Sequence, residues 1–243
     1  LKIKDGRMVS WDGWMPAEEA WTYDSADAPT YVITVPSDAR TKYSPGMRLK
    51  LTHEGSTKYF IVTAVAETAL TLYGGTDYTL SDSAITNPYY STQKAPLGFP
   101  LDPNKWSVKK KDTTERIATS VSANTWTNVG STSIDIPIGV WNVSHHVSAA
   151  GQTSESQTSL IVSVTLSTAN NSESDNEFTT SYTEVKGSAL VGLYAVSNSQ
   201  ISKTISLASK TTYYLNMKAT RNSNLIYKNN YAPLVIRATC AYL

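Results

Sequence analysis

The sequence is poor in charge, has one cysteine and contains no long apolar run. Lys, Arg, Asp and Glu make up 17% of the 243 residues, whereas soluble proteins usually carry about a quarter. The net charge is +1, which argues against a nucleic-acid partner. No run of about 18 apolar residues is present, so the sequence predicts no membrane insertion. Cys240 has no second cysteine to pair with, unlike the cysteines of disulfide-stabilised domains.

Hydroxyl side chains replace the missing charge. Serine (30 residues) and threonine (31 residues) together make up a quarter of the chain, and tyrosine (15) far exceeds phenylalanine (3). Threonine and tyrosine favour pleated, half-exposed strands. The composition therefore predicts an all-β protein. Its aromatic and branched residues suffice for a core, which excludes a disordered chain.

The composition changes near residue 104. Residues 1–104 hold 9 basic and 12 acidic residues, a balance of −3, whereas residues 105–243 hold 12 and 8, a balance of +4. The segment Lys94–Trp106 contains three prolines and a glycine, which is typical of a linker or a stiff crossing. We expect two domains, residues 1–100 and residues 101–243, with the boundary within residues 92–106.

Short strand-like runs dominate the first domain. Four or five of them in about 70 residues predict a small β-barrel of the OB type or a similar one, suited to attachment or spacing. The expected strands include Tyr31–Val35, Arg48–Thr52, Lys58–Val65 and Ala69–Tyr73.

The second domain alternates apolar and polar residues with a period of two, as sheets with one buried face do. About nine strands in roughly 130 residues predict an antiparallel β-sandwich or jelly roll. The segment RNSNLIYKNN is interpreted as a polar tip. The expected strands are Glu115–Ser122, Thr132–Ile136, Gly139–Ala149, Ser159–Thr168, Glu177–Glu184, Ser188–Val196, Ser202–Leu207, Thr211–Arg221 and Pro233–Tyr242.

No catalytic, metal-binding or cofactor-binding motif stands out. The nucleophile-elbow, zinc-protease, phosphate-loop and dinucleotide patterns are missing, so we predict no catalytic residue and no cofactor. His145 and His146 are neighbours in an expected strand and would point to opposite faces, so they cannot share one metal ion. Glu173, Asp175 and Glu177 lack the glycine and distal glutamate of a calcium loop. We predict no metal site.

Four aromatic residues near the N-terminus form the only candidate ligand surface. Trp11, Trp14, Trp21 and Tyr23 lie within thirteen residues. Aromatic faces suit the apolar faces of sugar rings, so this group could form a sugar-stacking platform. The alternative is that the four rings pack within the domain or against a neighbouring protein.

Most of residues 13–100 resemble a module of tail and baseplate-region proteins from tailed phages and prophages of Gram-positive bacteria. The pieces that carry the resemblance, in order, are GWMPAEEAWTY, VPSDARTKYSPGMRLKL, the strand KYF, the turn GGTDYTL, and PYYS before a proline-rich exit. Residues 120–243 resemble, more loosely, the trimeric jelly-roll heads of phage fibres and tumour-necrosis-factor-like domains. Here the pieces are TWTNVGSTSIDIPIGVWNVSHHV, KTTYYLNMKAT and LVIRATCAYL.

These resemblances imply a non-enzymatic virion protein of a phage tail or baseplate. Its head would form a homotrimer, contact other tail or baseplate proteins, and bind host cell-wall polysaccharide when the virion acts outside the host. The resemblances imply no catalytic residues. Low charge with abundant Ser, Thr and Tyr also suits large polar contact surfaces.

Two other functions stay open. A carbohydrate-binding module of a secreted or cell-surface protein would be a monomer with exposed aromatic rings. A polysaccharide hydrolase would need two facing carboxylates. The count of three histidines also leaves room for a Ser–His–Asp triad.

Overall fold

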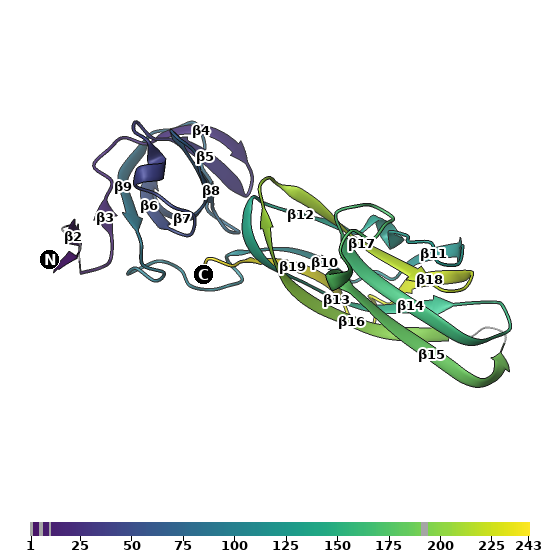
Figure 1. Ribbon diagram of the computed structural model, residues 1–243. Helices are drawn as coiled ribbons and strands as arrows, with labels where there is room; N and C mark the ends of the chain where they lie inside the picture. Colours follow the sequence, from purple (N-terminus) through teal and green to yellow (C-terminus); the bar gives the residue numbers. More distant parts are fainter. Residues whose placement is uncertain (1, 5–6, 10, 191–193) are drawn as a thin grey trace.

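The computed structural model describes residues 2–4, 7–9, 11–190 and 194–243. These residues fold into antiparallel sheets joined by loops and three short 3-10 helices. The prediction of an all-β protein is therefore confirmed. Figure 1 shows a curled sheet at one end and an elongated sandwich extending away from it. No helix among the described residues is long and apolar enough to cross a membrane.

The N-terminal part forms a seven-stranded antiparallel sheet that curls into a barrel-like shape (Figure 1). A small hairpin, β1 (Lys2–Lys4) with β2 (Arg7–Val9), precedes it. Apolar side chains at alternate positions, such as Leu49 and Leu51, point into the barrel and are buried. The strands in spatial order are β3 (Met15–Pro16), β9 (Ile85–Ser91), β6 (Arg48–His53), β7 (Ser56–Val65), β8 (Ala69–Tyr73), β5 (Thr30–Thr34) and β4 (Thr22–Asp27). The 3-10 helix η1 (Ala39–Thr41) buries Ala39 in this core.

The C-terminal part is a sandwich of two antiparallel sheets. Its larger sheet is built on β13 (Gly139–Gln152), which pairs with β19 (Leu234–Cys240) and then β18 (Ser223–Tyr227) along one edge. The other edge pairs with β16 (Tyr194–Leu207) over its whole length. The outer strands are β10 (Ser107–Asp112) and β11 (Arg116–Val121). The second sheet has the order β12 (Ser133–Ile136), β17 (Thr211–Ala219), β14 (Gln157–Ser167), β15 (Thr179–Leu190), with η2 (Val129–Ser131) and η3 (Asn176–Phe178) in the connections.

The sandwich core contains three sets of residues that alternate with a period of two, one set on each of β13, β14 and β17. Every residue in these sets is at most 7% exposed. At Gly151, strand β13 lies so close to β14 that a Cβ atom on this glycine would be only 2.7 Å from Cγ2 of Val162. The three sets are Trp141, Val143, His145 and Val147; Leu160, Val162, Val164 and Leu166; and Tyr213, Leu215, Met217 and Ala219.

Three strand predictions differ from the structure. The run Ser188–Val196 is not one strand: it includes the end of β15 and the start of β16, and residues 191–193 lie outside the described residues. The polar tip RNSNLIYKNN contains β18, whose Leu225 and Tyr227 are buried. Strand β10 was not among the expected strands. It forms an outer strand, and its three lysines are exposed.

Aromatic rings fill the joint between barrel and sandwich. Phe99 and Trp106 from the crossing stack in parallel with ring centroids 5.0 Å apart. Tyr73 of the barrel meets Trp141 of the sandwich edge-on at 4.9 Å. The indole N–H of Trp106 donates to the Pro100 carbonyl at 2.6 Å. Rings of this size bury a large apolar area, so the joint is a packed contact.

A buried guanidinium holds the joint from the barrel side. Arg48 is 0% exposed and donates to the carbonyls of Gly46, Lys94 and Tyr242. Its carbon Cζ also lies 4.9 Å from the centroid of the Phe99 ring. Burial lowers the pKa of Arg48. Arg48 therefore ties the crossing and the segment after β19 to strand β6.

Candidate functional site

The four aromatic candidates do not share one surface. Trp14 and Trp21 are 1% and 2% exposed, so of the two alternatives these rings follow packing within the domain and not the sugar-stacking platform. The Trp14 indole donates to the Leu97 carbonyl at 2.8 Å, and Trp21 packs edge-on against Tyr43. Both tryptophans are therefore core residues, in a chain that has only three phenylalanines. Trp11 is 83% exposed and Tyr23 is half-buried, so only these two stay accessible.

The adjacent histidines point to opposite faces of β13, as predicted. His145 is buried between the sheets, and its Nε2 lies 3.0 Å from Oγ of Ser199. Burial lowers its pKa to about 4. His146 is half-buried on the other face. Among the described residues, no group of three or more His, Cys, Asp or Glu side chains could hold a metal ion.

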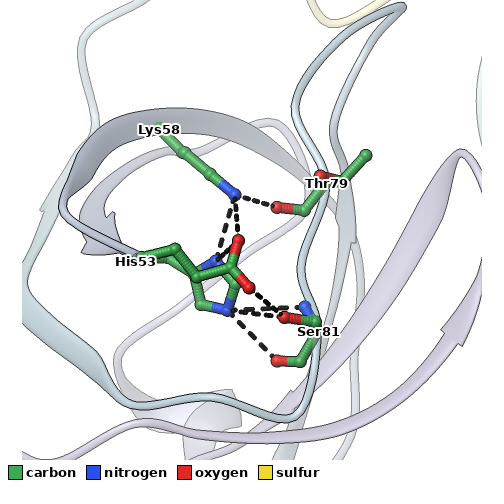
Figure 2. Close-up of polar contacts among 5 residues, drawn as sticks. His53, Lys58, Thr79 and Ser81 are labelled. Atoms are coloured by element: carbon green, nitrogen blue, oxygen red, sulfur yellow. Dashed lines mark hydrogen bonds and ion pairs between the residues drawn. The ribbon is translucent and has the colours of Figure 1, made fainter.

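One polar cluster combines histidine, serine and glutamate. His53 ends β6, and its Nε2 lies 3.4 Å from Oγ of Ser81. Its Nδ1 lies 3.5 Å from Oε2 of Glu54 and 3.0 Å from Nζ of Lys58. Lys58 also donates to the Thr79 carbonyl at 2.8 Å. Figure 2 shows these side chains converging between the β6–β7 turn and the chain at residues 79–81.

The hydrogen bonds of this cluster oppose a catalytic role. Lys58 can only donate, so Nδ1 of His53 accepts. The proton then sits on Nε2, which donates to the Ser81 carbonyl at 3.1 Å. A general base must instead accept the proton of its serine. The Ser81 hydroxyl donates to Glu54 at 2.7 Å. The cluster therefore fastens the β6–β7 turn to the neighbouring loop.

A polar pocket of about 650 Å³ lies at the end of the sandwich that is remote from the barrel. Figure 1 shows β11 and β18 at this end. The pocket is formed by the bulged part of β11, the end of β13 and the start of β18. Every lining side chain carries a hydroxyl or a carboxamide, and none is charged. The lining residues are Ser120, Ser122, Gln152, Thr153, Ser154, Asn222, Ser223 and Asn224. We call this site the distal pocket.

Two asparagines hold the wall of the distal pocket in shape. The pairing of β11 with β18 is interrupted by a β-bulge between Ala118 and Val121, and Ser120 has a positive φ of 55°. The Asn224 side chain accepts from the Ser120 N–H at 3.0 Å. The Asn222 side chain accepts from the Ala123 N–H at 2.9 Å and donates to Glu155 at 2.6 Å. Such bulges recur beside functional sites.

Ser223 lies between these two asparagines and is 4% exposed. Its hydroxyl oxygen has no hydrogen-bond partner among the described residues. Leaving a buried hydroxyl unpaired costs about 1–3 kcal/mol. This buried hydroxyl is therefore a cost to the fold at this end of the sandwich.

The sequence alone did not reveal this pocket. Its residues come from three segments that lie up to about 100 positions apart, and no local motif links them. The available signal is the combination of RNSN with QTS and SVS, short stretches rich in Ser, Thr, Asn and Gln at the ends of strands. Such stretches recur throughout this Ser- and Thr-rich chain.

Comparisons with known proteins give only distant similarities. No family model matches the chain, and no curated protein matches it. A structure of dimeric latent PorU from Porphyromonas gingivalis matches with a TM-score of 0.29 and 11% identity over 93% of this chain, which spans 24% of that one. The infectious bursal disease virus VP2 subviral particle gives 0.28 and 10%, over 95% of this chain and 78% of that chain. A tandem CBM22 domain of Xyn10C from Paenibacillus barcinonensis gives 0.22 and 13%, over 96% and 94%. These scores assign no function.

Proposed function

We propose that the protein is a non-enzymatic appendage of a phage or prophage tail or baseplate that binds host-surface polysaccharide. In this proposal the barrel is the attachment or spacer domain, and the sandwich is the head domain. One observation carries the binding role: the head has a pocket lined only by uncharged hydrogen-bonding side chains, at the end remote from the barrel. Polar groups that converge in a pocket are typical of ligand sites. The tail assignment rests on the resemblance of residues 13–100 to tail modules.

The lining of the pocket favours binding over hydrolysis. Glycoside hydrolysis uses a pair of carboxylates, roughly 5–9 Å apart. No carboxylate lines the distal pocket, and the nearby Glu155 is bonded to Asn222. The proposed role is therefore recognition.

Exposed apolar side chains on the two long strands support a homotrimeric head. Tyr182 and Val185 on β15 and Val196 on β16 are at least 40% exposed. The edges of β15 and β16 lie against each other within the chain, where the hydroxyls of Thr180 and Ser199 share a hydrogen bond. Exposed apolar groups are commonly covered in an assembly, and closed cyclic symmetry is the usual form.

Two measurements on the intact chain test this proposal. Light scattering over a range of concentrations should give about three times the chain mass, and labelled protein should bind intact Gram-positive cells and their extracted wall polysaccharide. A strict monomer would contradict the trimer. Failure to bind any wall polymer would contradict the recognition role.

A carbohydrate-binding module of a secreted or cell-surface protein is the second candidate. The observation in its favour is that a single chain forms the whole distal pocket, so a monomer could bind. This candidate predicts a monomer in which Trp11→Ala, which removes the most accessible ring, weakens sugar binding and leaves folding intact. Unchanged sugar binding in Trp11→Ala would count against it.

A further inference from the structure

We propose that the distal pocket is the subsite for an uncharged saccharide unit, bound by the hydroxyl and carboxamide groups that line it. This inference rests on the proposed function, and it names the ligand class and the residues that select it.

The chemistry of the lining matches a polyol. Serine and threonine hydroxyls and the carboxamides of asparagine and glutamine can each donate and accept hydrogen bonds. Sugar hydroxyls do the same, so each lining group can pair with a sugar hydroxyl in either direction. A phosphate or carboxylate would lose its hydration there without gaining a cation, which is costly. The absence of charge among the lining side chains therefore selects against acidic polymers.

Two asparagines preorganise the site. The side chains of Asn222 and Asn224 accept hydrogen bonds from the N–H groups of Ala123 and Ser120. Because these bonds fix both side chains before binding, little conformational freedom is lost when the ligand arrives.

Gln152 gives the pocket an adjustable wall. It ends β13 opposite Asn224 in the strand register and is exposed. Its carboxamide can therefore follow a ligand that the two fixed asparagines cannot reach. Ser122 and Gln152 are both exposed and come from different segments of the pocket wall, so substituting each of them tests the site independently.

The test compares two polymers on the full chain. Phosphate-free wall polysaccharide and glycerol-phosphate teichoic acid from the same Gram-positive bacterium are titrated calorimetrically at about 0.05 M and about 0.5 M salt. We expect binding of the phosphate-free polymer to change less than about twofold between these salt concentrations, because no ion pair forms. Binding of teichoic acid alone, or a steep loss with salt, would overturn the inference and leave the recognition role standing.

Variants then locate the site. Ser122→Ala and Gln152→Ala should each weaken binding of the phosphate-free polymer by about tenfold, the value of one to two lost hydrogen bonds. Ser209→Ala is the matched control, because Ser209 is exposed in the turn between β16 and β17, outside the pocket. Equal binding by all three variants would place the site elsewhere and overturn the inference alone. No binding of either polymer by the unaltered chain would overturn the proposed function with it.

Discussion

The two ends of the sandwich are built from different chemistry. The end at the barrel contains stacked rings, tight backbone approaches and the fully buried Arg48, whose guanidinium donates to three carbonyls. The remote end has a bulged strand and a pocket of hydroxyl and amide groups, one of which is buried and unpaired. The first end gains stability from burial, whereas the second carries a buried unpaired hydroxyl that costs stability and a polar pocket on its surface.

The largest effect is expected at the joint. Trp106→Ala removes a fully buried ring that stacks on Phe99, so the free energy of unfolding should fall by about 3–5 kcal/mol. Denaturant unfolding measures the change. Trp11→Ala is the control, because Trp11 is 83% exposed and its loss should change the free energy by less than about 0.5 kcal/mol. Similar losses in both variants would remove the distinction between a packed joint and a solvated surface.

Between the two ends, His145 makes the core sensitive to pH. Burial lowers its folded pKa from 6.5 to about 4, so the unfolded chain binds a proton that the folded chain does not. Stability is fully present above about pH 6.5 and is lost as the pH falls toward 4, by up to about 3 kcal/mol. His145→Phe should remove this dependence, because Ser199 still has Thr180 as a partner. Parallel pH profiles for the two proteins would contradict the assignment.

A comparison of two distant glycines, Gly75 at the joint and Gly55 in the β6–β7 turn, tests how tightly the joint is packed. Gly75 has a φ of +67°, and a Cβ there would lie 2.6 Å from the Lys105 carbonyl oxygen. Gly55 has a similar φ of +73° with no atom within 4 Å. Gly55→Ala should cost about 1 kcal/mol for backbone strain alone, and Gly75→Ala about 1–3 kcal/mol more for overpacking. Equal losses in thermal unfolding would show that the joint yields easily.

The sequence predicts the strands far better than the site. Alternation fixed the inward faces of β13, β14 and β17, because a half-buried strand repeats every two residues. It did not detect β18, since SNLIY is flanked on both sides by polar residues. For Trp14 and Trp21 the sequence left two alternatives open, because a ring that can stack on sugar also fills a core. Which of the two occurs depends on contacts far along the chain, such as Trp14 with Leu97.

The smallest expected effect contrasts two buried serines, one at each end. Ser107 at the joint is 6% exposed, and its hydroxyl bonds the Pro103 carbonyl at 2.6 Å and Thr239 at 2.8 Å. Ser223 in the distal pocket is similarly buried but unpaired. Ser107→Ala should lower the free energy of unfolding by about 1–2 kcal/mol, whereas Ser223→Ala should leave it unchanged or raise it by up to about 1 kcal/mol. Denaturant unfolding of both variants without ligand decides the matter. A loss in Ser223→Ala as large as that in Ser107→Ala would mean that its hydroxyl supports the fold. A stable Ser223→Ala would show instead that the hydroxyl contributes nothing to folding.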